Sequence, residues 1–128
     1  MINFSEDAVF NLTGIDEEKV KKEIDNLLID DEYIVGAFRT VRDQVVFTNM
    51  RIIAIDVQGV TGKRKEFTTL PYSKIQYFSI TTPGFIEIIP DCELQIVFNN
   101  NFHAKFDFSG KCDIVSLGRC ISEYALAI

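Results

Sequence analysis

Short runs of apolar residues alternate with polar and turn-forming residues along most of the chain. Between residues 32 and 108, seven runs are rich in β-branched and aromatic side chains, a composition that predicts β-strands. The predicted strands are 32–41, 44–49, 51–57, 63–70, 73–82, 92–98 and 102–108. Their connections are short apart from 83–91, so neighbouring strands are expected to pair as an antiparallel meander.

The last two predicted strands show the most regular alternation. Apolar residues fall on one face of each strand and polar residues on the other. The apolar set is Leu94, Ile96 and Phe98, then Phe102, Ala104, Phe106 and Phe108; the polar set is Glu93 and Gln95, then His103, Lys105 and Asp107. One buried and one solvated face are typical of an antiparallel sheet over a single core.

Two segments change to a helical period. In 16–28 the apolar stripe is Val20, Ile24, Leu27 and Leu28, and the acids at 16–18 suit the positive end of the helix dipole. In the C-terminal segment the stripe is Ile114, Leu117, Ile121, Tyr124 and Ile128, and Ser109 or Gly110 is the expected start. This second helix is expected to bury its stripe against an open end of the curled sheet.

These elements predict one mainly β domain over residues 1–128. It consists of an N-terminal helical segment at 1–31, a sheet at 32–108 and a capping helix at 110–127. A chain of 128 residues is long enough to bury a core without disulfides or metals.

Charge is unevenly distributed and excludes one class of partner. The formal net charge is −6, and residues 1–32 carry ten acids against three lysines, so the rest of the chain is nearly neutral. Nucleic-acid binding needs a basic face that neutralises phosphates, and this chain offers none. We therefore expect no nucleic-acid partner.

Cysteine spacing and hydropathy indicate a reducing, cytoplasmic location. The three cysteines, at 92, 112 and 120, form no C-x-x-C pair, so neither a disulfide framework nor a zinc ribbon is encoded. The first residues, MINFSEDAVF, lack the features of a signal peptide, and no run approaches the ~18 apolar residues of a membrane span.

The stretch QGVTGKRKEF, residues 58–67, superficially resembles a phosphate-binding loop. Val57 stands where the first glycine of that motif belongs, and Arg64 stands where its Ser or Thr belongs. A strand, not a helix, follows, so Gly59 and Gly62 are interpreted as turn residues with positive φ.

A small basic cluster is the candidate binding site. Loops 41–43, 58–62 and 99–101 are expected to share one rim of the sheet, bringing together cationic side chains and the amides of 99–101. The candidate ligand-binding residues are Arg39, Arg42, Lys63 and Arg64.

The sequence offers little for catalysis. His103 is the single histidine and lies on the polar face of its strand, and Asp107 is roughly 13 Å further along that face, too far to share a metal ion. Cys112 and Cys120 fit packing positions. We expect no enzymatic activity, no cofactor and no metal.

Residues 42–80 carry the motifs of a known family. The hairpin RDQVVFTNMR, the turn DVQGVTGK and the strand PYSKIQYFS, together with DCEL at 91–94 and FSGKCDI at 108–114, resemble the bacterial pleckstrin-homology-like domain family. The resemblance extends over nearly the whole chain.

That resemblance implies two near-orthogonal sheets with a C-terminal helix at one corner, and a small protein that assembles into a ring of like subunits. It implies no reaction. The leading hypothesis is a self-assembling protein-interaction module with an unidentified protein partner. The alternative is peripheral binding of anionic lipid or a small phosphorylated ligand at the basic rim. Membrane contact is not favoured, because the protein is acidic and the first hairpin offers only Arg39 and Arg42 beside Asp43.

Overall fold

A computed structural model describes residues 2–83 and 89–127. The strands are β1 (Ala8–Gly14), β2 (Ile34–Arg39), β3 (Gln44–Thr48), β4 (Arg51–Gln58), β5 (Arg64–Pro71), β6 (Ile75–Thr81), β7 (Ile89–Pro90), β8 (Glu93–Phe98), β9 (His103–Ser109) and β10 (Lys111–Cys112). The helices are α1 (Glu17–Ile24), α2 (Ile114–Ala125) and the 3-10 turn η1 (Tyr72–Lys74).

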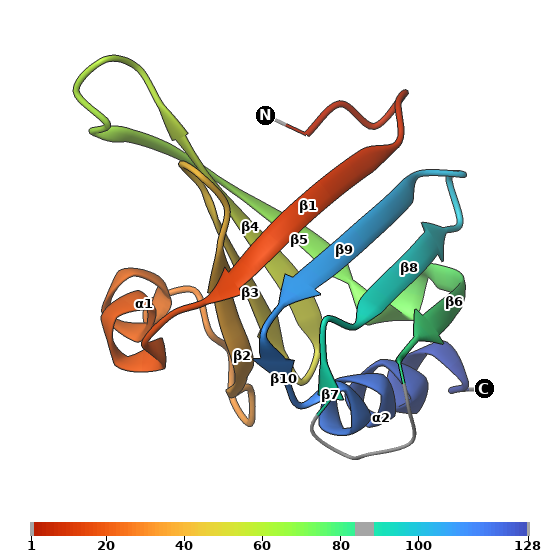
Figure 1. Ribbon diagram of the computed structural model, residues 1–128. Coiled ribbons are helices and arrows are strands. Elements are labelled where there is room, and N and C mark those ends of the chain that lie inside the picture. The colour runs from red at the N-terminus through yellow and green to blue at the C-terminus, as the bar shows by residue number, and fades with distance from the viewer. Residues whose placement is uncertain (1, 84–88, 128) are drawn as a thin grey trace.

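Eight strands form one strongly curled sheet that wraps around the core (Figure 1). Their order is β5-β4-β3-β2-β1-β9-β8-β6, and β7 pairs with β10 as a separate ribbon. β5 and β6 are joined only by η1, yet they occupy the two ends of this order. The mainly β class and the C-terminal helix predicted from the sequence are confirmed.

The predicted helical segment at 1–31 is wrong in its first half, because Ala8–Gly14 is the strand β1. It runs parallel to β9 from the Ala8–Ala104 pair onwards and antiparallel to β2 at its end. β1 thereby joins two antiparallel sets of strands, β2–β5 and β6, β8 and β9, into one sheet. The simple meander fails at this point. β1 forms because its residues can pair with the free edges of β2 and β9, and those edges exist only in the folded chain.

The concave face of the sheet encloses the main core. Phe47 of β3, Tyr72 of η1 and Phe106 of β9 have essentially no exposed surface. The alternation predicted for the last two strands is confirmed, since the apolar residues of β8 and β9 are buried. Phe47 and Phe106 meet edge to face at 5.3 Å, as aromatic pairs prefer.

Helix α1 packs on the opposite, outer face of β2–β4. Asp16 caps it by accepting a hydrogen bond from the Glu18 amide, and Val20 and Ile24 are buried against the sheet. The helix ends at Ile24, earlier than predicted, and Leu27 is 42% exposed. The prediction that Leu27 continues the buried stripe is therefore wrong, because the chain leaves helical geometry before reaching it.

Helix α2 lies along one end of the curled sheet (Figure 1). It buries Ile114, Leu117 and Ile121 in the main core, as predicted. Its N-cap is Asp113, which accepts from the Ser116 amide, so the predicted start at 109 or 110 is wrong. Residues 111–112 pair with β7 instead. Part of the predicted 83–91 crossover and Ile128 lie outside the described residues.

Candidate binding site

The β2–β3 and β4–β5 hairpins meet at one end of the sheet, as the sequence predicts. Arg42 donates a 2.6 Å hydrogen bond from Nη2 to the carbonyl of Gly59, and Asp43 accepts one of 3.0 Å from the amide of Val57. Gly59 and Gly62 have φ values of 78° and 68°, so their interpretation as turn residues is confirmed. We call Arg39, Arg42, Lys63 and Arg64 the basic rim.

The cations of the basic rim point to both faces of the sheet. Arg39 pairs with Gln44, and this register places it on the outer face of the sheet, which α1 covers. Arg64 pairs with Gln58 and lies on the concave face. Lys65, which the sequence places on the other face from Arg64, forms a 3.0 Å ion pair with Glu23 of α1. The rim therefore presents separate charges and not one basic face.

The turn 99–101 does not join this rim, so that prediction is wrong. The Asn99 amide bonds to the carbonyl of Lys74, beyond the far end of β5. Arg64 is the first of the eight residues of β5, so the rest of this strand, roughly 23 Å long, separates Arg64 from this point. The error arises because η1 carries β6 away from β5, which places the β8–β9 turn at the other end of the barrel.

A pocket of about 290 Å³ beside the rim is lined by acidic side chains. Glu6 and Asp7 come from the segment before β1, Asp43 from the β2–β3 turn and Asp56 from β4. Asp43 is adjacent to Arg42 in the β2–β3 turn, so carboxylates of this pocket offset part of the positive charge of the rim. Such a surface is unfavourable for a multiply charged anion.

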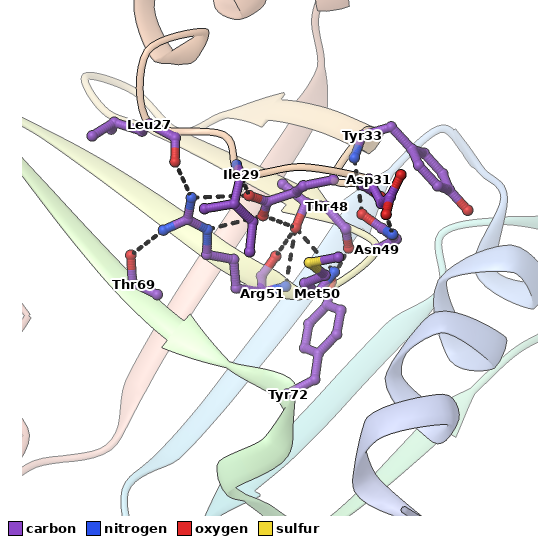
Figure 2. Close-up of polar contacts among 11 residues, drawn as sticks. Leu27, Ile29, Asp31, Tyr33, Thr48, Asn49, Met50, Arg51, Thr69 and Tyr72 are labelled. Atoms are coloured by element: carbon purple, nitrogen blue, oxygen red, sulfur yellow. Dashed lines mark hydrogen bonds and ion pairs between the residues drawn. The ribbon is translucent and has the colours of Figure 1, made fainter.

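A buried polar cluster was not predicted from the sequence (Figure 2). The Glu32 side chain is completely buried and forms two hydrogen bonds with the Arg51 guanidinium, of 2.9 and 3.0 Å. Thr48 donates to the same carboxylate at 2.6 Å, and Tyr72 donates from its hydroxyl to the Thr48 carbonyl at 2.6 Å. The cluster joins the β3–β4 hairpin to the segment before β2 and to η1.

The same cluster explains motif residues that the sequence left without a role. Arg51 also donates to the carbonyl of Leu27 and to the Thr69 hydroxyl, and Asn49 holds the Tyr33 amide at 2.9 Å. The FTNMR and PYS motifs thus stabilise the fold. The sequence did contain a signal for this cluster, namely a threonine, an asparagine and an arginine close together in a tight hairpin.

The surroundings of Glu32 favour the charged form of its carboxylate. Burial raises the pKa of Glu32, but hydrogen bonds from Arg51, Thr48 and the Ile29 amide outweigh it and hold this pKa below its ordinary value. The carboxylate is therefore a fixed structural anion at neutral pH, and the Arg51 charge is neutralised beside it.

The groups considered for catalysis lie apart from one another. His103 is exposed on the outer face of β9. Burial raises the pKa of Cys112 to about 12 and also raises those of Cys92 and Cys120, so their thiols are poor nucleophiles. Among the described residues, no group of three or more histidine, cysteine or acidic side chains is arranged to hold a metal ion.

The model of one protein family, "Bacterial PH domain", matches residues 3–125. The chain belongs to the bacterial PH domain family. This PH domain is 37% identical over 95 residues to the uncharacterized protein YjqA of Bacillus subtilis, covering 74% of each chain, and 34% identical over 76 residues to YozO of the same organism, covering 59% of this chain and 64% of YozO.

Solved structures give the same assignment. A DUF1696-family protein with a pleckstrin-homology domain from Shewanella loihica matches with a TM-score of 0.68 and 29% identity, over 91% of this chain and 98% of that one. A pleckstrin homology domain from Shewanella amazonensis matches with a TM-score of 0.55 and 34% identity, over 88% and 90%. No helix among the residues that the structure describes in this PH domain is long and apolar enough to cross a membrane.

Proposed function

We propose that this PH domain is a non-catalytic scaffold that assembles with copies of itself and presents the repeated surface to a protein partner. The observation that carries the proposal is the edge strand β6. Within the described residues β6 pairs only with β8, so among these residues no strand pairs with the other side of β6. An edge of this kind is a template for pairing with another chain.

The β6 edge carries none of the charges or prolines that commonly discourage such pairing, and α2 packs against Ile80 near the end of the strand. Its sequence, IQYFSIT, contains no charge and no proline, and Tyr77 and Ile80 are 59% and 37% exposed. At the other end of the sheet, β5 begins with Arg64, Lys65 and Glu66 and ends with a proline. Charges and proline discourage edge pairing. The contrast between the two edges supports β6 as the assembly edge.

The non-catalytic part of the proposal rests on the chemistry of the available side chains. The exposed His103 lies apart from the cysteines, and all three thiols have raised pKa values. Three free cysteines are also consistent with the proposed cytoplasmic location.

Light scattering coupled to size exclusion tests the assembly. We expect a mass that is a multiple of 14.6 kDa, and a mass of 14.6 kDa at every concentration would contradict the proposal. Ser79→Lys places a charge on the exposed β6 edge and should lower the mass without changing the circular dichroism spectrum. Gln95→Lys is the matched control, because Gln95 is exposed opposite Ser79 but lies on the internal strand β8.

A second candidate function is binding of anionic lipid or a small phosphorylated ligand at the basic rim. It is favoured by the exposure of Arg42, Lys63 and Arg64 at one end of the molecule. We rank it lower because the rim cations point to both faces and four carboxylates line the neighbouring pocket.

A further inference from the structure

A pocket of about 300 Å³ lies between the end of β5 and the β8–β9 turn. Among the described residues β5 and β6 are the two ends of the strand order and do not pair with each other, so the sheet is not closed here. The apolar walls come from Leu70 and Pro71 of β5, Phe98 and Phe102 at the turn, and Phe4 of the N-terminal segment. We call this site the aromatic pocket.

Three phenylalanine rings define the inside of the aromatic pocket. Phe4 meets Phe102 edge to face at 5.0 Å, and Phe98 stacks on Phe102 at 5.9 Å. Phe98 and Phe102 are buried, whereas Phe4 is 45% exposed. A ligand ring that enters beside Phe4 therefore meets ring faces and edges in the arrangements that aromatic pairs prefer.

Hydrogen bonds hold the wall formed by the β8–β9 turn in place. The Asn99 amide donates to the Lys74 carbonyl at 2.8 Å, which ties the turn to η1. The Phe98 amide donates to the Phe102 carbonyl at 3.0 Å, and the Phe102 amide donates to Oδ1 of Asn100 at 3.2 Å. A site that is shaped before binding loses little conformational entropy when a ligand arrives.

Polar groups at the edge of the aromatic pocket can donate hydrogen bonds to an anion. Lys74 is exposed, and its ammonium group forms no ion pair in the described part of the chain. Asn99 and Asn100 are also exposed, and their side-chain amino groups donate to no other described residue. The described residues that line this pocket include no carboxylate, whereas four carboxylates line the pocket beside the basic rim. One cation with two amide donors favours a ligand that carries a carboxylate.

The size and the walls of the aromatic pocket favour a small molecule over an extended peptide. A volume of about 300 Å³ is at the lower limit of small-ligand sites and suits a single ring with a short acidic chain. Pro71 has no backbone N–H, so a peptide cannot continue the β-ladder along this part of β5. Recognition therefore depends on the ring and on the charge of the ligand.

We propose that the aromatic pocket binds a small aromatic carboxylic acid. The ring of the ligand packs beside Phe4 and Phe102, and its carboxylate accepts hydrogen bonds from Lys74 and from the side-chain amino groups of Asn99 and Asn100. This inference adds a ligand-binding function to the proposed scaffold and does not rest on self-assembly.

Ligand-observed NMR titration of the full chain with hydrocinnamate tests the site. This probe is phenylalanine without its amino group, so it supplies one ring and one carboxylate. The affinity typical of a compound of this size corresponds to a dissociation constant of about 4 mM, and we expect this value or a lower one. Hydrocinnamamide keeps the ring but carries no charge, and it should bind about tenfold more weakly. Equal binding of the acid and the amide would overturn the proposal.

Two variants separate the contact with the carboxylate from the contact with the ring. Lys74→Gln should weaken hydrocinnamate binding about tenfold and leave hydrocinnamamide binding unchanged. Phe4→Ala should weaken the binding of both probes, because both contain the ring. Lys111→Gln is the matched control, since it removes an exposed lysine that does not line the pocket and should change neither affinity. Circular dichroism spectra of all variants establish that folding is preserved.

A peptide that ends in phenylalanine distinguishes a small acid from the end of a protein chain. Acetyl-Gly-Gly-Phe with a free carboxylate should bind no more tightly than hydrocinnamate. Markedly tighter binding of the peptide would assign the pocket to a protein terminus and overturn the small-acid proposal. An absence of hydrocinnamate binding to the wild type, or an affinity that Lys74→Gln leaves unchanged, would overturn it as well. Neither result bears on the mass measured by light scattering, so self-assembly is tested separately.

Discussion

At the scale of single residues, the Glu32–Arg51 pair is the interaction on which the local structure most depends. The Glu32 side chain is fully buried and the Arg51 side chain is 18% exposed. Breaking a buried ion pair by removing one partner leaves an uncompensated charge, whereas exposed pairs contribute little. Lys65–Glu23, with both side chains about one-third exposed, provides the comparison within the same molecule.

We predict that Glu32→Gln destabilises the protein by about 3–5 kcal/mol, because it leaves the Arg51 charge buried without a counter-ion. Glu23→Gln, which breaks the exposed pair, should cost less than about 1 kcal/mol. Urea unfolding followed by circular dichroism measures both. Equal effects of the two substitutions would show that burial does not strengthen the Glu32 interaction.

The lowered pKa of Glu32 also predicts how stability depends on pH. The stabilisation from this carboxylate is fully present above its ordinary pKa of 4.5 and is lost as the pH falls through the lower pKa of the folded state. The free energy of unfolding should therefore decrease below about pH 4.5. In Glu32→Gln, the free energy of unfolding should decrease less steeply over this acidic range. Unfolding curves between pH 2.5 and 6 test this, and parallel limbs for the two proteins would refute it.

At the scale of elements, the C-terminal helix completes the core. Ile121 of α2 has no exposed surface, whereas Val115 on the same helix is 44% exposed. Sequence periodicity separates these positions correctly, because a helix that lies on one end of a curled sheet buries one stripe. The N-terminal segment behaves differently: β1 is recognisable as a strand only through its partners β2 and β9.

Ile121→Asp should therefore lower the free energy of unfolding by several kcal/mol, because it places an unpaired carboxylate in the core. Val115→Asp serves as its control and should have little effect, since this position is exposed and lies in the first turn of α2, where the helix dipole favours an acid. Thermal and urea unfolding measure both variants. An unaltered Ile121→Asp melting curve would mean that α2 does not pack against the sheet.

At the scale of the whole molecule, charge is segregated between the two ends of the β2–β4 strands. The formal net charge is −6, a pocket lined by Glu17, Glu18 and Asp25 lies beside the start of β2, and the basic rim at the other end is interrupted by carboxylates. A membrane responds to the average charge of a broad surface, whereas a protein partner can meet each charge individually. This difference underlies our preference for assembly over lipid binding.

We accordingly predict little association with vesicles that contain acidic phospholipids, measured by co-sedimentation at low and physiological salt. Any residual association should be the same for Lys63→Glu with Arg64→Glu as for the wild type, after assembly state is taken into account. Strong binding that weakens with salt and disappears in this variant would instead support the anionic-ligand function.

Residue patterns alone predict the mainly β class, the buried faces of β8 and β9, the buried stripe of α2 and the meeting of the two hairpins at the rim. These features follow from local periodicity and from short connections, which a linear sequence contains. The FTNMR and PYS motifs also identified the family, although not the role of its residues.

The features that join distant segments could be recognised only in the folded chain. β1 needs the free edges of β2 and β9, and Glu32 needs Arg51, 19 positions later, before its burial is favourable. The turn 99–101 left the predicted rim because η1 redirects β6, and Leu27 became exposed because Arg51 holds its carbonyl outside α1. Each outcome depends on hydrogen-bond partners far apart in sequence, and local pattern carries no information about which of them will meet.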